Sequence, residues 1–182
     1  YGDIIFDIDL TRLMDCHHAH RGLGTLLVHP NDHPFDSDLL VTDRLNRIIH
    51  FIPKPHSAGQ VYQNLVNAGI YVLRPEIARL IESGQKLDFG RDVFPALVDD
   101  GKDLYAYRTP EYVKDAGSPR RYEEVQRDLL NGRVYHRNLK KKQKAVFLDR
   151  DGVINEEVDF LSSPEQLTLI DGSPEAVKIF NE

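Results

Sequence analysis

The chain has 182 residues, 41% of them hydrophobic, and a formal net charge of −6 at pH 7. This length suits one domain, or one and a fraction, and the acidic charge argues against a general nucleic-acid binder. Cys16 is the only cysteine and no stretch approaches the roughly 18 apolar residues of a membrane helix, so we expect a cytoplasmic protein without disulfides or a membrane partner.

Strand-like and helix-like segments alternate through residues 1–133. The strand-like segments are Ile4–Phe6, Leu23–Val28, Leu39–Val41, Arg47–Ile52, Leu65–Leu73 and Leu104–Arg108. Of these, Leu39–Val41 and Arg47–Ile52 look like the two strands of a hairpin around a turn at Asp43–Asn46. The helix-like segments are Asp9–His17, Pro75–Ser83, Arg91–Asp99 and Ser118–Asn131. The last is the strongest, because Ser118 can cap it, Pro119 takes its first position and Gly132 can end it. The alternation predicts an α/β domain with a mostly parallel sheet.

A linker is predicted at residues 134–143, which lack apolar periodicity and contain Lys140-Lys141-Lys142. A lysine run of this kind can bind nucleic acid, but in an acidic chain it more often solvates the lead-in to a strand. Residues 144–182 form a second part, which opens with the apolar strand-like run before Asp149 and ends with a helix from Ser173.

Asp149 and Asp151 follow that strand in the run Lys144–Asn155. Side chains two residues apart leave a strand on the same face, so the two carboxylates would repel each other unless a cation such as Mg²⁺ lay between them. Asp149 would then be placed to attack phosphorus and Asp151 to transfer a proton. An EF-hand calcium loop fits less well, because Gly152 comes too early and Phe160 stands where that loop needs Glu. An acidic surface turn is the other alternative.

The run Lys144–Phe160 resembles the first motif of the haloacid-dehalogenase (HAD) phosphatases, and among them the enzymes that act on heptose 1,7-bisphosphate; histidinol-phosphate phosphatase is close to these. The resemblance implies that residues 144–182 are the first strand-helix unit of a HAD-like α/β domain. It also implies that Asp149 is the nucleophile and that Asp149 and Asp151 bind Mg²⁺. The later HAD motifs, a Ser or Thr, a Lys and an acidic pair, do not occur in these residues.

A second constellation lies in residues 1–133. Its members are Gly2-Asp3, Pro53-Lys54-Pro55, Asn67-Ala68-Gly69 and Lys114-Asp115-Ala116-Gly117-Ser118-Pro119. A carboxylate beside glycine can sit where backbone and a metal-bound phosphate approach closely, and two such carboxylates could jointly hold one Mg²⁺. A lysine between prolines is held on a stiff backbone and can be aimed at a phosphate. Alternatively, Asp3 and Asp115 belong to ordinary turns.

The order and spacing of these motifs resemble the sugar-1-phosphate nucleotidyltransferase family over nearly all of residues 1–133. The resemblance implies an incomplete Rossmann-like domain without the family's Gly-rich nucleotide-binding loop. It implies that Asp3 and Asp115 are Mg²⁺ ligands, that Lys54 contacts the sugar phosphate, and that Asn67 and Gly69 line the sugar pocket. The expected partners are a nucleoside triphosphate and a sugar phosphate, and the reaction releases pyrophosphate.

Together the two resemblances suggest a bifunctional enzyme of nucleotide-activated heptose synthesis for bacterial lipopolysaccharide. A non-catalytic, transferase-like binding or scaffolding module is the alternative. We expect the 182 residues alone to be inactive, because one wall of the nucleotide site is missing. The sequence does not say which base or sugar is used, and an oligomer is possible.

Overall fold

The structure is a computed structural model that describes residues 2–31, 34–56, 62–81, 84–142 and 144–181. The chain divides into two compact units, Tyr1–Lys141 and Lys142–Glu182, which we call unit 1 and unit 2. Each unit is described by itself. Within the described residues, no helix combines the length and the apolar character that crossing a membrane requires.

The main sheet of unit 1 has the strand order β4-β3-β5-β2-β6. Its strands are β2 (Gly24–His29), β3 (Leu39–Thr42), β4 (Ile48–Ile52), β5 (Val66–Leu73) and β6 (Leu104–Arg108). Only the β2–β6 pair is parallel, so the prediction of a mostly parallel sheet is wrong. The reason lies in the connections: a tight turn, held by two backbone N–H groups that donate to Asp43, makes β3 and β4 a hairpin, and β5 returns antiparallel to β2.

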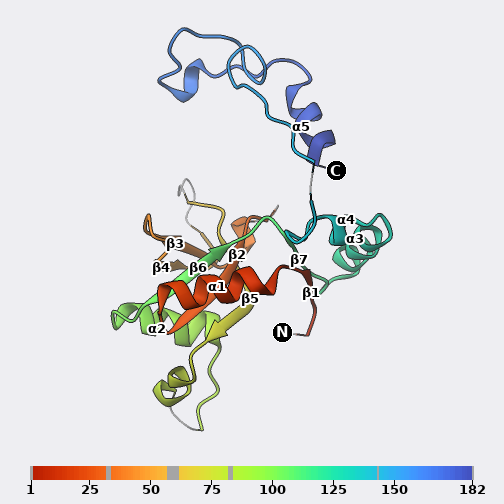
Figure 1. The fold of residues 1–182 in the computed structure, drawn as a ribbon. Coiled ribbons are helices and arrows are strands. Elements are labelled where there is room, and N and C mark those ends of the chain that lie inside the picture. The colour runs from red at the N-terminus through yellow and green to blue at the C-terminus, as the bar shows by residue number, and fades with distance from the viewer. Residues whose placement is uncertain (1, 32–33, 57–61, 82–83, 143, 182) are drawn as a thin grey trace. The chain divides into compact units, whose positions relative to one another are not determined.

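Helices cover both faces of this sheet (Figure 1). Successive residues of a strand point to opposite faces, so Leu26 and Leu27 enter different parts of the core. Leu26 belongs to one apolar cluster with Phe94 of α2 (Phe94–Asp99), and Leu27 to another with Leu13 of α1 (Leu10–His20). Side chains therefore cover the central strand β2 on both faces, and β2 is buried along nearly its whole length.

The helices of unit 1 differ in detail from their predictions. α1 begins after Asp9, whose side chain accepts a hydrogen bond from the Thr11 N–H. The predicted helix Pro75–Ser83 is a 3₁₀ helix, η2 (Pro75–Leu80), and residues 82–83 lie outside the described part of the chain. The predicted helix Arg91–Asp99 begins earlier, with a π-helical turn, η3 (Phe89–Val93), that leads into α2. A further short 3₁₀ turn is η1 (Pro34–Asp36).

A separate two-stranded antiparallel sheet joins β1 (Ile4–Asp7) to β7 (Tyr112–Asp115). β7 was not predicted from the sequence; it is short and ends in two charged residues. α3 (Pro119–Leu130) packs on β7 through ion pairs and a hydrogen bond: Lys114 Nζ lies 2.7 Å from Glu124 Oε2, and the Tyr112 hydroxyl donates to Asp128.

The structure differs from the linker predicted for residues 134–143. α4 (Arg133–His136) falls in this segment, and unit 1 extends to Lys141. Val134 and Asn138 are buried, and the Asn138 side chain donates to Asp7 at 2.6 Å. The segment has little periodicity because it is held by individual polar contacts rather than by an apolar stripe.

Unit 2 has little regular structure. It contains the 3₁₀ turn η4 (Pro164–Gln166), the helix α5 (Ser173–Asn181), and isolated bridges that pair Asn155 with Asp151 and with Leu169. The helix from Ser173 was predicted, but the strand before Asp149 is not formed. Phe147 in this segment is 94% exposed. No described segment of unit 2 forms a ladder with it, and a strand without a hydrogen-bonded neighbour is not stable.

Candidate functional site

Asp3 and Asp115 lie side by side although 112 positions separate them in the sequence. The pairing of β1 with β7 sets Ile4 opposite Asp115, and the Ala116 N–H donates to the Asp3 carbonyl at 2.7 Å. Two antiparallel strands therefore deliver both acids to the same end of the small sheet. The backbone, not a direct contact between the side chains, creates this juxtaposition.

The carboxylates of Asp3 and Asp115 both lie next to Gly117. A Cβ atom added there would lie 2.8 Å from Asp3 Oδ2 and 3.0 Å from Asp115 Oδ1, so both oxygens border the same small space beside the glycine. Mg²⁺ prefers carboxylate oxygens at about 2.0–2.1 Å and commonly takes one or two of them, with water and phosphate oxygens at its other positions. The two carboxylates and the missing side chain fit such an ion.

Local contacts orient Asp115. Its Oδ1 accepts the Gly117 N–H at 2.8 Å and lies 3.2 Å from Arg121 Nε. Arg121 stands in the first turn of α3, which Ser118 caps by accepting the Arg121 N–H. The guanidinium balances part of the negative charge of the two acids and fixes one carboxylate, whereas Asp3 is exposed and has room to adjust.

A second group of predicted residues gathers around Asp38. The Lys54 N–H donates to Asp38 Oδ1 at 3.1 Å, and the Asn67 N–H donates to the Asp38 carbonyl at 3.3 Å. One residue between η1 and β3 thus connects the end of β4 with the start of β5. The structure therefore brings Lys54 and Asn67 to a common neighbour.

The side-chain amide of Asn67 is fixed by a hydrogen bond within β5 and lies next to Gly90. Its Oδ1 accepts the Gly69 N–H at 3.1 Å, and Gly69 has a φ of 74°, which favours glycine. A Cβ atom at Gly90 would lie 3.0 Å from Asn67 Nδ2 and 3.4 Å from Asp88 Oδ1. The turn at residues 88–91 approaches Asn67 closely, so a side chain at Gly90 would fit only if the Asn67 amide shifted by a few tenths of an ångström.

Arg91 in this turn was not predicted as a site residue. Its guanidinium forms two hydrogen bonds with Asp92, which raise the pKa of Arg91 and lower the pKa of Asp92. The charge of Asp38 also acts on Arg91, so the arginine belongs to the neighbourhood of Lys54 and Asn67. The only feature of the sequence that pointed to Arg91 is the motif Asp88-Phe89-Gly90-Arg91-Asp92 that contains it.

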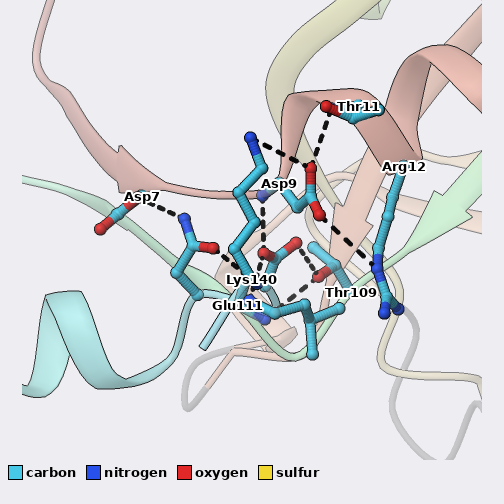
Figure 2. A network of polar contacts seen from close by, with 9 residues as sticks. Asp7, Asp9, Thr11, Arg12, Thr109, Glu111 and Lys140 are labelled. Atoms are coloured by element: carbon cyan, nitrogen blue, oxygen red, sulfur yellow. Dashed lines mark hydrogen bonds and ion pairs between the residues drawn. The ribbon is translucent and has the colours of Figure 1, made fainter. Parts of the chain in front are cut away.

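A buried polar junction, which was not predicted from the sequence, is centred on Glu111 (Figure 2). Glu111 is 3% exposed. Its Oε1 accepts the N–H of Asp9 at 2.7 Å and that of Leu139 at 2.9 Å, and its Oε2 accepts the Thr109 hydroxyl at 2.8 Å. A Glu after Thr-Pro reads as a loop residue, so nothing in the local pattern indicated burial. This carboxylate joins three distant segments of unit 1.

Asp9 extends the junction toward the start of α1. Its carboxylate accepts the Thr11 N–H and lies 3.6 Å from Lys140 Nζ and 3.7 Å from Arg12 Nε. Burial acts to raise the pKa of Asp9, but the backbone hydrogen bonds from Thr11 and Arg12, with the charge of Lys140, outweigh it and lower the pKa. Asp9 is therefore held ionised between two cations.

Asp149 and Asp151 are arranged differently from their prediction. Asp151 accepts Arg150 Nε at 2.9 Å and Asn155 Nδ2 at 3.0 Å, which lower its pKa, whereas Asp149 accepts the Arg150 N–H. The Arg150 guanidinium therefore forms an ion pair with the Asp151 carboxylate. Since no strand forms before them, the two acids are not presented on one strand face. Among the described residues, no cluster of three or more His, Cys, Asp or Glu could hold a metal ion.

Residues 1–132 match the family model described as nucleotidyl transferase. The chain is 31% identical over 135 residues to a UTP–glucose-1-phosphate uridylyltransferase of Synechocystis sp., covering 73% of the chain and 34% of that protein. It is 32% identical over 155 residues to a mannose-1-phosphate guanyltransferase of Kluyveromyces lactis, covering 84% and 40%. A mannose-1-phosphate guanylyltransferase of Mycobacterium tuberculosis is 32% identical over 133 residues, covering 72% and 36%. The chain thus spans little more than a third of the length of these curated relatives.

Proposed function

Because the chain belongs to the nucleotidyl transferase family, we propose that its full-length protein joins a sugar 1-phosphate to a nucleoside triphosphate and releases pyrophosphate. The observation that carries the proposal is the convergence of the Asp3 and Asp115 carboxylates beside Gly117. Two acids that meet at a gap in the side-chain packing are suited to hold a cation against phosphate oxygens.

In this reaction an oxygen of the sugar phosphate attacks the α-phosphorus of the triphosphate, a new P–O bond forms, and the bond to the leaving pyrophosphate breaks. Such chemistry depends on positioning and on neutralising negative charge. Mg²⁺, when bound by Asp3 and Asp115, would supply positive charge to the phosphate oxygens. Arg121 holds Asp115 in place, so the approach of anionic substrates does not displace that carboxylate.

We assign the sugar phosphate to the group around Asp38. Lys54 would contact the phosphate as a point charge, since its backbone is tied to Asp38. Asn67 would present its amide to sugar hydroxyls from a fixed position, because Gly69 engages its oxygen and the turn at Gly90 closes one side. The names of the relatives above give glucose 1-phosphate or mannose 1-phosphate and different nucleotides, so we propose a hexose or heptose 1-phosphate as the substrate without assigning the base.

Changing either acid tests the proposal. We expect Asp3→Asn and Asp115→Asn in the full-length protein to lower pyrophosphate release by about 10²–10³-fold, the range for removing one charge-stabilising group from a transition state. Asp99→Asn, an exposed residue of α2, is the matched control and should retain activity. Near-normal turnover by both variants would exclude the assignment, and a wild-type protein without turnover would favour a scaffolding role.

We also propose a second, phosphatase activity, on the strength of the Asp149–Asn155 motif alone. It would remove the 7-phosphate of a heptose 1,7-bisphosphate and so supply a sugar 1-phosphate to the first activity. In the full-length protein, Asp149→Asn should abolish phosphate release from such a bisphosphate while pyrophosphate release continues. Asp159→Asn, exposed in the same unit, is the control. Unchanged phosphate release by Asp149→Asn would exclude this activity and leave the transferase proposal intact.

A further inference from the structure

A hollow of about 480 Å³ lies at the amino ends of the parallel strands β2 and β6, and nothing proposed above uses it. The following residues line it: Arg21, Gly22, Leu23, Glu76, Arg79, Leu80, Gly101, Lys102 and Asp103. They come from the end of α1, from η2 and from the loop between α2 and β6. The volume falls in the usual range for small-molecule sites, about 300–1,000 Å³.

The walls of the hollow are tied together at Leu23. The Leu23 N–H donates to the Asp103 carbonyl at 2.8 Å, and the Leu23 carbonyl accepts the Arg74 N–H at 2.8 Å. Through these two hydrogen bonds, Leu23 links the three segments that precede β2, β6 and η2. A pocket whose backbone is already fixed loses little entropy on binding a ligand.

Positive charge dominates the lining. Arg21, Arg79 and Lys102 contribute three cations, and none of them has an ion-pair partner among the residues that the structure describes. The lining also holds two acids, Glu76 and Asp103. Asp103 is already paired with Arg47, whose Nε lies 2.7 Å from its Oδ1, so three cations are set against one remaining acid. Unpaired cations around a concave surface favour an anion with more than one charge.

The lining also offers room for an uncharged group. Leu23 and Leu80 add apolar surface, and Gly101 exposes backbone: a Cβ atom added there would meet nothing within 4 Å. The ligand should therefore be larger than a bare phosphate ion and partly apolar.

The hollow is remote from the sugar site proposed above. β5 runs from Asn67, opposite Val28 near the carboxyl end of β2, to Leu73, opposite Gly24 at its amino end. Six residues of extended strand span about 20 Å. A ligand in the hollow would not touch Asn67, so the two sites would be occupied independently.

We propose that this hollow is a second binding site, for a small organic phosphate that carries a phosphate monoester and an apolar or ring group. The phosphate would lie among Arg21, Arg79 and Lys102, and the rest of the ligand against Leu23 and Leu80. The proposal is independent of the transferase reaction, because it depends only on the charge and shape of this hollow.

Calorimetric titration of the chain with inorganic phosphate and with phenyl phosphate tests the proposal. We expect saturable binding, tighter for phenyl phosphate because its ring covers apolar surface. Arg21→Gln and Lys102→Gln should each weaken binding about tenfold, the loss of one charge-assisted hydrogen bond. Lys86→Gln, an exposed lysine outside the lining, should bind as the wild type does. Thermal unfolding of each variant confirms that it is folded.

Lys54→Gln separates this hollow from the proposed sugar site. Retained binding in Lys54→Gln, together with the losses in the two hollow variants, supports the proposal. Three results would overturn it: no saturable binding of either probe, equal weakening in Lys86→Gln, or binding that is lost in Lys54→Gln and kept in the hollow variants.

Discussion

Units 1 and 2 each carry a pair of acidic residues that the sequence predicts to bind Mg²⁺, and the two pairs are held in opposite ways. Asp3 and Asp115 stand on paired strands that bring their oxygens to one small space. Asp149 and Asp151 stand in a turn, where Arg150 engages the second of them. The pairing of β1 with β7 therefore brings the first two acids together in space, whereas the second two are neighbours only in sequence.

The same contrast extends to the polar contacts of the two units. In unit 1 the Glu111 carboxylate is buried and accepts hydrogen bonds from three segments. In unit 2 the ion pair of Arg150 with Asp151 is exposed, and apolar side chains such as Phe147 and Phe160 face solvent. Contacts of similar length should therefore contribute very different free energies.

The largest expected effect is at Glu111. Glu111→Ala removes the acceptor of two backbone N–H groups and a hydroxyl, so we expect the free energy of unfolding of unit 1 to fall by about 3–5 kcal/mol. All eight tyrosines precede residue 142, so tyrosine fluorescence during urea unfolding follows unit 1 alone. Glu123→Ala, exposed on α3, should change the value by no more than about 0.5 kcal/mol. A similar small change for Glu111→Ala would remove the contrast between the units.

An intermediate effect concerns pH. His17 is buried beside Thr25, and burial, followed by the charge of Arg74, lowers its pKa. The unfolded chain then binds more protons than the folded one, so this contribution to the stability of unit 1 is present above pH about 6.5 and is lost as the pH falls toward the folded pKa. Unit 2 contains no histidine, so only unit 1 should respond in this window.

His17→Gln tests this dependence, because it keeps a polar partner for Thr25 without a titrating group. The variant should lose much of the change in tyrosine-monitored stability between pH 7 and pH 5. His50→Gln, exposed on β4, is the control. A wild-type slope that persists in His17→Gln would assign the effect to another group.

The smallest expected effect is at Asp151. Its pair with Arg150 is exposed, and exposed ion pairs contribute little to stability, so Asp151→Asn should destabilise unit 2 only slightly. Amide hydrogen exchange of residues 151–156 measures it, with Asp159→Asn as the reference. Much faster exchange in Asp151→Asn alone would mean that this turn is as firmly built as the Glu111 junction.

Structural features that depend on a few neighbouring residues were predicted correctly from the sequence. Ser118, Pro119 and Gly132 bracket α3, whose cap the structure contains, and the turn at Asp43 predicted the hairpin of β3 and β4. A cap or a turn depends on contacts within a few residues, so its sequence carries nearly all the information.

Features that depend on distant partners were missed or wrongly predicted. The short strand β7 exists because β1 pairs with it, and Glu111 is buried because Asp9 and Leu139 reach it. Conversely, the apolar segment before Asp149 has the composition of a strand but forms none, because strand propensity requires a neighbour. The juxtaposition of Asp3 with Asp115 was expected only through a family resemblance, since 112 positions separate them.

The Glu111 junction also bears on the order in which unit 1 assembles. Its hydrogen bond from the Asp9 N–H joins residues 102 positions apart, and its hydrogen bond from the Leu139 N–H requires the segment after α4 to be in place. Contacts that close such long loops form late, after local helices and hairpins. We therefore expect loss of the junction to change the folding rate little and to speed unfolding, which would shorten the lifetime of the native state.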